Sequence, residues 1–241
     1  MKKVLIAIML IVSFAAMLFS LREILNWNKD NIKTKESIEK IQEITKVEIS
    51  SNEKFLSMGF DELSKMNEEV VAWIRVDDTA VDYPVVKHSD NSYYLTHSFD
   101  KSFNYAGWIY ADYRTDLDEL MANNIIYGHG REDGSMFGTL RDLIKKDGRE
   151  RLVYISTPYN NYIFKIFSSY RIMDTNDYLH VGYDSNKEFL EFVNLITKRS
   201  FIKYDDLEIK PSDKILTLAT CYDTKEKFVV HAKLIDMEKR Y

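Results

Sequence analysis

The chain has 241 residues, of which 45% are hydrophobic and 13% aromatic, enough apolar side chain for a packed core, which excludes a largely disordered protein. The formal net charge of −5 excludes the strongly basic face that nucleic-acid binding requires, so we expect no nucleic-acid partner. The single cysteine, Cys221, excludes an intramolecular disulfide and is either a buried apolar residue or a reactive thiol.

The N-terminus carries a candidate membrane segment. Residues 4–21 form an uncharged apolar run between Lys3 and Arg22. As a helix the run is just long enough to cross a bilayer, and it is longer than the apolar stretch of most signal peptides. We therefore expect an uncleaved membrane anchor over residues 1–21, with cleavage as the alternative. Basic residues flank the run on both sides, so their distribution does not choose an orientation.

Residues 22–60 are expected to form a helical stalk or linker that leads to the main domain. Apolar residues at three-residue spacing predict an amphipathic helix over residues 31–47, and a second short helix is predicted over residues 61–71. The main domain is expected to span residues 61–241.

From Ala72 onward, short β-branched and aromatic runs predict about eight strands. These runs lie at residues 73–76, 81–86, 107–110, 124–127, 151–156, 162–173, 215–220 and 228–235. Helical spacing of apolar residues predicts two further helices, over residues 136–146 and 186–198. Short strands with few helices favour a mainly β fold, a closed barrel with N-terminal helices and a helical insert before the last strands.

One candidate catalytic residue is a histidine between two glycines, at the end of a predicted strand in Asn124-Ile-Ile-Tyr-Gly-His-Gly130. The glycines leave the imidazole of His129 uncrowded, and a histidine at such a place is suited to proton exchange near neutral pH. A turn histidine with one backbone hydrogen bond explains the same motif equally well.

The cysteine ends another predicted strand, in Lys214-Ile-Leu-Thr-Leu-Ala-Thr-Cys221. Side chains alternate along a strand, so Cys221 is expected on the same face as Thr217 and Ala219. Lys227 opens the next strand, which we expect beside the first, and its positive charge would favour a thiolate or stabilise an oxyanion. A cysteine and a histidine at separate strand ends are the groups that thiol acyl transfer uses.

These two motifs resemble the signature of the sortase family, and their details resemble class B. The most specific part is Thr217-Leu-Ala-Thr-Cys221, together with Ile125-Ile-Tyr-Gly-His129. Supporting matches are Asp90-Asn-Ser-Tyr-Tyr-Leu95, Met136-Phe137 and the helical insert at residues 186–198. The resemblance covers roughly residue 61 to the C-terminus and implies an eight-stranded β-barrel.

The resemblance also implies a membrane-anchored cysteine transpeptidase that needs no cofactor. Cys221 would attack the carbonyl after the threonine of a C-terminal sorting motif, and His129 would protonate the departing amine. An amine of a peptidoglycan precursor would then accept the acyl group, which would join a surface protein to the cell wall. The catalytic domain would lie outside the cytoplasm on a single membrane span. The residues that the resemblance assigns to substrate binding are Asn91, Leu95, Tyr178, Leu179 and Thr220.

Three positions depart from the family's pattern. Lys227 stands where the family has its catalytic arginine, Gly130 stands where asparagine is common, and Ala219 replaces a frequent serine. Because lysine offers a point charge where arginine offers a planar fork, we expect weaker oxyanion stabilisation. Two alternatives remain open: a thiol peptidase that releases its acyl group to water, and a non-catalytic or weakly active barrel that binds sorting motifs or wall peptides.

The remaining polar residues carry no predicted site. The other histidines lack paired ligand spacing, so no metal site is predicted. Asp112, Asp116 and Asp118 are expected to lie in a solvated loop and not to bind calcium. Asp223 is expected to be a solvated turn residue near the thiol.

Overall fold

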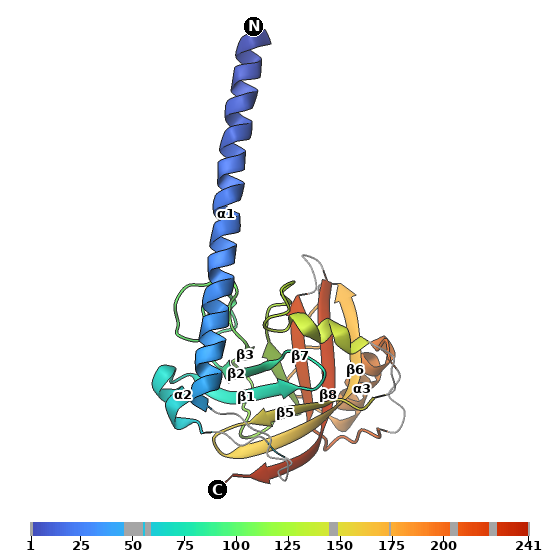
Figure 1. Cartoon of the computed structure of the whole chain (residues 1–241). Coiled ribbons are helices and arrows are strands. Elements are labelled where there is room, and N and C mark those ends of the chain that lie inside the picture. The colour runs from blue at the N-terminus through green and yellow to red at the C-terminus, as the bar shows by residue number, and fades with distance from the viewer. Residues whose placement is uncertain are drawn as a thin grey trace.

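A long helix and a β-barrel make up the part of the chain that the structure describes (Figure 1). The computed structural model describes residues 2–45, 55, 59–144, 149–173, 175–202, 207–221 and 226–240, and of Cys221 it describes only the place in its strand. The N-terminal half of the helix extends away from the barrel, and the C-terminus lies at the opposite end of the molecule (Figure 1).

Eight strands within the described ranges close into a barrel in the order β1-β2-β3-β4-β7-β8-β6-β5. The strands are β1 Val70–Val76, β2 Asp82–Val86, β3 Tyr110–Ala111, β4 Asn123–Tyr127, β5 Leu152–Ser156, β6 Asn160–Met173, β7 Ile215–Cys221 and β8 Glu226–Lys239. Neighbours are antiparallel except in the pairs β2–β3 and β4–β7, which are parallel. The predicted eight-stranded, mainly β barrel is confirmed.

Helices occur before the barrel and between its strands. Those in the described residues are α1 Lys2–Thr45, α2 Asp61–Met66, α3 Asn186–Arg199 and the 3₁₀-helices η1 Tyr93–Leu95 and η2 Gly138–Ile144. The predicted N-terminal helices and the helical insert before the last two strands are therefore present. The apolar run and residues 31–45 of the amphipathic segment predicted after it form one unbroken helix, α1. Residues 46–54 and 56–58 of the predicted stalk lie outside the described residues.

Three elements are clearly shorter than predicted. The helix predicted over residues 61–71 ends at Met66, because Val70 joins β1. The strand predicted over residues 107–110 is reduced to β3, since Gly107 adopts a φ of +59°, a left-handed conformation that ends an extended run. Likewise the helix predicted from residue 136 begins only at η2, because Met136 has a φ of +53°.

Strand β7 is buried on both faces, which explains its nearly continuous apolar sequence. Leu216 and Leu218 point into the barrel, where they join the main core. Ile215 and Ala219 face outward into a second apolar cluster beneath α3. The alternation predicted for this strand is confirmed for these four side chains.

Helix α3 packs against β6, and its apolar face shares a cluster with residues of β6, β7 and β8. The Ser185 side chain caps it by accepting from the Glu188 backbone N–H, a preferred way to satisfy a free donor at a helix start. Burial of its apolar face stabilises the fold by about 2 kcal/mol for each fully covered side chain. The buried residues of α3 are Phe189, Phe192 and Ile196.

Helix α1 changes character along its length. Most apolar side chains of its first half are exposed, whereas Thr34, Ile41 and Thr45 are buried against the barrel side. Within the described residues, α1 is the one helix that is long and apolar enough to cross a membrane.

Candidate active site

The ends of three neighbouring strands meet at one edge of the barrel. Strand β4 is parallel to β7 with Tyr127 opposite Ala219, and β7 is antiparallel to β8 with Cys221 opposite Lys227. His129 follows Tyr127 by two residues, as Cys221 follows Ala219. The pairing also continues one residue past β4, because the N–H of the residue after Tyr127 donates to the Ala219 carbonyl at 3.3 Å. The backbone register thus brings the two motifs to the same level of adjacent strands.

A cavity of about 240 Å³ opens at this edge. Its wall is mostly apolar, with a few polar groups, as is typical of ligand-binding clefts. Six of the residues that the sequence predicted as site residues line it: His129, Lys227, Leu95, Tyr178, Leu179 and Thr220. The wall is completed by residues that were not predicted, namely Tyr110, Tyr127, Gly128, Asn176 and Ala219.

The imidazole of His129 is held by one backbone acceptor. Its Nε2 lies 2.8 Å from the carbonyl oxygen of Leu95, at the end of η1. A carbonyl only accepts, so Nε2–H donates this hydrogen bond, which does not involve Nδ1. The predicted backbone hydrogen bond of a turn histidine is thus present, and the same bond orients the ring beside the cavity.

Gly107 makes this arrangement of His129 possible. A Cβ atom on Gly107 would lie 2.8 Å from His129 Cδ2 and 2.8 Å from the Leu95 carbonyl oxygen, closer than real Cβ contacts. Only a glycine lets the segment pass so near the ring while holding a φ of +59°. The sequence offered no signal for this role, because the glycine lies more than twenty residues before the histidine in an ordinary turn-like stretch.

The predicted contact Asn91 does not line the cavity. Its amide donates to the carboxylate of Asp112 at 3.0 Å, and Tyr127 and Arg114 donate to the same carboxylate at 2.9 and 2.8 Å. Asp112 is fully buried, so the expectation of a solvated loop is wrong for this residue. Burial alone would raise the pKa of the Asp112 carboxyl, but the hydrogen bonds from Arg114, Tyr127 and Asn91 outweigh it and lower that pKa.

Asp112 therefore joins two walls of the cavity. Tyr127 forms one wall of the cavity. Burial raises the pKa of the Tyr127 hydroxyl and the nearby Asp112 charge raises it further, so the hydroxyl stays a hydrogen-bond donor. Arg114 reaches the other wall by donating to the Leu179 carbonyl at 3.1 Å. The Asn123 amide supports the same wall by donating to the His180 carbonyl at 2.8 Å.

A second buried network ties Asn123 to the strands behind the cavity. The Thr217 hydroxyl donates to Asn123 Oδ1 at 2.6 Å and accepts from His231 Nδ1 at 2.9 Å, while the Tyr170 hydroxyl donates to His231 Nε2 at 2.9 Å. Burial, assisted by the Arg199 charge, lowers the pKa of His231 to about 3. The ring is neutral, and it connects four adjacent strands without facing the cavity.

Two predicted features of the site fall at the limit of the described residues. Asp223 lies outside them, and Cys221 is located by its pairing with Lys227. Among the described residues there is no group of three histidine, cysteine or acidic side chains that could hold a metal ion.

Comparison with known proteins gives one consistent answer. Residues 74–235 match the family model described as a sortase domain. The chain is 27% identical to sortase B of Staphylococcus aureus (strain NCTC 8325 / PS 47), with 98% of each protein covered. It is 32% identical to sortase B of Listeria monocytogenes serovar 1/2a (strain ATCC BAA-679 / EGD-e), with 72% of this chain and 73% of that protein covered.

Solved structures extend the similarity to the fold. A Staphylococcus aureus sortase B–substrate complex superposes with a TM-score of 0.77 at 27% identity, over 86% of this chain and 99% of that one. Sortase B from B. anthracis in complex with AAEK1 superposes with a TM-score of 0.76 at 30% identity, again over 86% and 99%. The similarity therefore extends to the fold of most of the chain.

Proposed function

The chain belongs to the sortase family of cysteine transpeptidases, and on this premise we propose that it cleaves a C-terminal sorting motif after its threonine and transfers the acyl group to a peptidoglycan precursor amine. The observation that supports the proposal is the register of β4, β7 and β8. Cys221 pairs with Lys227 across β7 and β8, and Lys227 and His129 line one cavity. The solved complex of a similar sortase B with its substrate supports a peptide as the ligand.

The first half of the reaction forms a thioester. The Cys221 thiolate attacks the threonine carbonyl carbon, a carbon–sulfur bond forms, and the carbonyl oxygen becomes an oxyanion. Collapse of this intermediate breaks the carbon–nitrogen bond, and protonated His129 gives its Nδ1 proton to the departing amine. The Leu95 carbonyl keeps the other ring nitrogen occupied, so a single nitrogen handles the proton.

The second half returns the enzyme to its starting state. An incoming amine attacks the thioester and gives a proton to the neutral His129, and the carbon–sulfur bond breaks to release the Cys221 thiolate. Lys227 is proposed to stabilise the thiolate and the two oxyanions with its positive charge, at the place of the family's arginine.

The cavity wall supplies the proposed peptide contacts. Leu95, Tyr178, Leu179 and Thr220 would contact the sorting motif, since all four line the cavity. For Asn91 the support is the family resemblance alone, because its side chain is bound to Asp112 and does not line the cavity.

We also propose the cellular arrangement that this chemistry requires. Residues 4–21 would cross the cell membrane once, and the catalytic domain would lie outside the cytoplasm, where wall precursors are found. Support comes from the length and apolar character of α1, whose apolar window is fully exposed in the folded chain. The proposed division remains an anchor over residues 1–21, a stalk over 22–60 and a catalytic domain over 61–241.

Mass spectrometry with a panel of candidate motif peptides tests the proposed reaction. We expect a thioacyl adduct on Cys221, cleavage after threonine, and an amide product when a diamino acid or glycine amine is supplied. Hydrolysis without amide formation would indicate a peptidase, and binding without an adduct would indicate a non-catalytic barrel. A Cys221→Ala protein that still cleaves the peptide would refute the enzymatic mechanism.

A further inference from the structure

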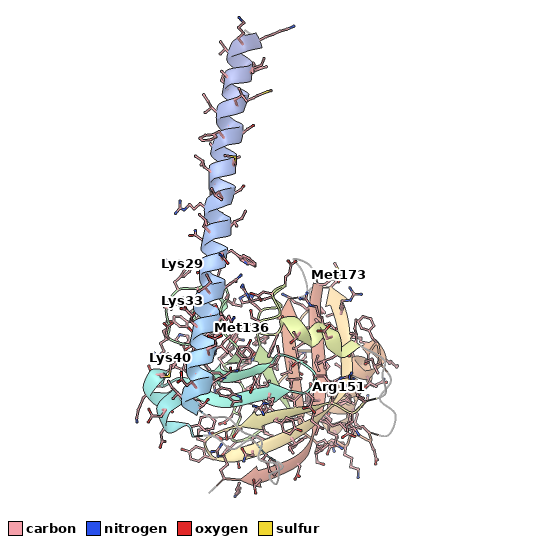
Figure 2. The ribbon with its side chains drawn as sticks, in the orientation of Figure 1. Lys29, Lys33, Lys40, Met136, Arg151 and Met173 are labelled. Atoms are coloured by element: carbon pink, nitrogen blue, oxygen red, sulfur yellow. The ribbon has the colours of Figure 1, made fainter. Side chains whose placement is uncertain are left out.

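The cavity lies at the end of the barrel that faces the N-terminal half of α1. Met173 ends β6 and pairs with Glu226, the residue before Lys227. Figure 2 places Met173 at about the level of Lys29 on α1, whereas Arg151 lies further from the helix N-terminus. The strand edge that bears the candidate active site therefore faces the proposed membrane.

Helix α1 is docked on the barrel from Asn31 onward. The Asn104 amide donates to the Thr34 hydroxyl at 2.9 Å in a buried contact, and Lys33 donates to Ser102. Further along, Ile41 is buried in the main core. A hydrogen bond and an apolar anchor on the same side of the helix leave it little freedom to swing.

Two barrel segments that hydrogen-bond to α1 also set the position of His129. One segment holds Asn104 and also provides the Leu95 carbonyl that binds the imidazole. The other begins at His129 itself, and its Arg131 donates to Asn31 of α1. The orientation of α1 and the orientation of the proposed acid are thus fixed by the same two segments.

The helix between the apolar run and the first barrel contact has a definite length. The ten residues from Arg22 to Asn31 are all helical. At 1.5 Å per residue they span about 15 Å. A flexible linker of the same length would allow a wide range of heights, whereas an unbroken helix allows essentially one.

We propose that residues 22–45 of α1 act as a rigid spacer that holds the active-site edge at a fixed height above the membrane. The spacer favours an acyl donor that is itself anchored in the same bilayer and presents its cleavable bond at that height. For such a donor the effective concentration at the cavity depends on how well the two heights match. This inference rests on the proposed function, because it presupposes that the cavity cleaves a peptide.

The test uses the full-length chain in lipid vesicles with two donors that carry the same motif. One donor is a soluble peptide, and the other is joined to a transmembrane helix by a tether of defined length. The variant has seven helix-forming residues inserted after Lys29. They add about 10 Å and turn the docked face by about 20° only.

We expect the insertion to lower turnover of the tethered donor about tenfold or more, because its bond no longer reaches the cavity. Turnover of the soluble peptide should stay unchanged, and a correspondingly longer donor tether should restore the tethered reaction. A second variant with residues 23–29 replaced by glycine and serine should accept a broad range of tether lengths.

The outcomes separate the spacer from the proposed function. If the parent cleaves neither donor, the proposed function fails. If the parent cleaves both, and the insertion leaves tethered turnover and its dependence on tether length unchanged, the spacer proposal is overturned while the function stands.

Discussion

At the residue scale, Lys227 gives the sharpest test of the proposed mechanism. An ammonium group delivers a point charge and an arginine delivers a fork of donors to a developing oxyanion. Loss of one such donor costs about 3 kcal/mol, so we expect Lys227→Ala to lower kcat/KM about 100-fold. Lys227→Arg should be at least as fast as the parent in the same peptide-cleavage assay.

The matched control for Lys227 is Lys187→Ala, since Lys187 is an exposed residue of α3 that does not line the cavity. Equal rates for the parent and Lys227→Ala would remove Lys227 from the mechanism, whatever the arginine variant does.

Gly107 is a positioning residue, and the chain provides a control for its backbone strain. Gly107→Ala places a methyl group against His129 and the Leu95 carbonyl, whereas Gly134, with a φ of +82°, has only a 3.5 Å contact with Thr139. Both alanines cost about 1 kcal/mol of stability through the left-handed backbone. Only Gly107→Ala should displace the imidazole, and a misplacement of about 1 Å lowers kcat about 100-fold.

Urea unfolding of the two glycine variants measures the stability cost of the left-handed backbone. Their peptide-cleavage rates measure the effect of displacing the His129 imidazole. A Gly107→Ala enzyme with the same kcat as Gly134→Ala would show that the close approach to His129 has no catalytic importance.

At the element scale, the buried network around His231 couples four strands and makes the fold sensitive to acid. The pKa of His231 is about 3 in the folded state, below its ordinary value of 6.5. The unfolded chain therefore binds a proton that the folded chain does not, so this part of the stability is complete above pH 6.5 and is lost as pH falls toward 3. Through this group the free energy of unfolding changes by at most about 1.4 kcal/mol per pH unit.

Urea unfolding at several pH values from 7 to 4 measures this slope. His231→Gln should have a shallower dependence on pH than the parent, because the titrating group is gone. Tyr170→Phe should keep the parent slope and lose about 1 kcal/mol at every pH, since it removes one hydrogen bond and no titrating group. Identical slopes for His231→Gln and the parent would contradict the buried neutral ring.

The strands and the two motifs could be predicted because local sequence determines them. The apolar alternation in β7 and the histidine between glycines both depend on neighbouring residues alone. The fully buried Asp112 could not be predicted, because its donors come from three separate segments of the chain. The same holds for Gly107, whose contact with His129 exists only after the barrel has closed.

At the scale of the whole molecule, the docked end of α1 contributes to the stability of the barrel. Ile41 is 1% exposed in the main core. Removing such a side chain costs about 2–5 kcal/mol. A chain that begins at residue 30 should therefore unfold at a clearly higher temperature than one that begins at residue 46, and both should remain soluble without the apolar run.

Thermal unfolding of the two truncated chains measures this contribution. Equal unfolding temperatures would mean that residues 30–45 are a passive stalk, and the predicted boundary at residue 61 would then describe the independently stable domain.

The parallel pairing of β4 with β7 has a consequence for when the enzyme first becomes reactive. Strand β4 is made long before β7, and α3 and two other strands are made between them. Pairings between such distant segments form late in folding, after large loops have been closed. A newly made chain therefore does not yet hold the ends of β4 and β7, which carry the two motifs, side by side. The candidate active site is assembled only when the last two strands, β7 and β8, have reached their places in the barrel.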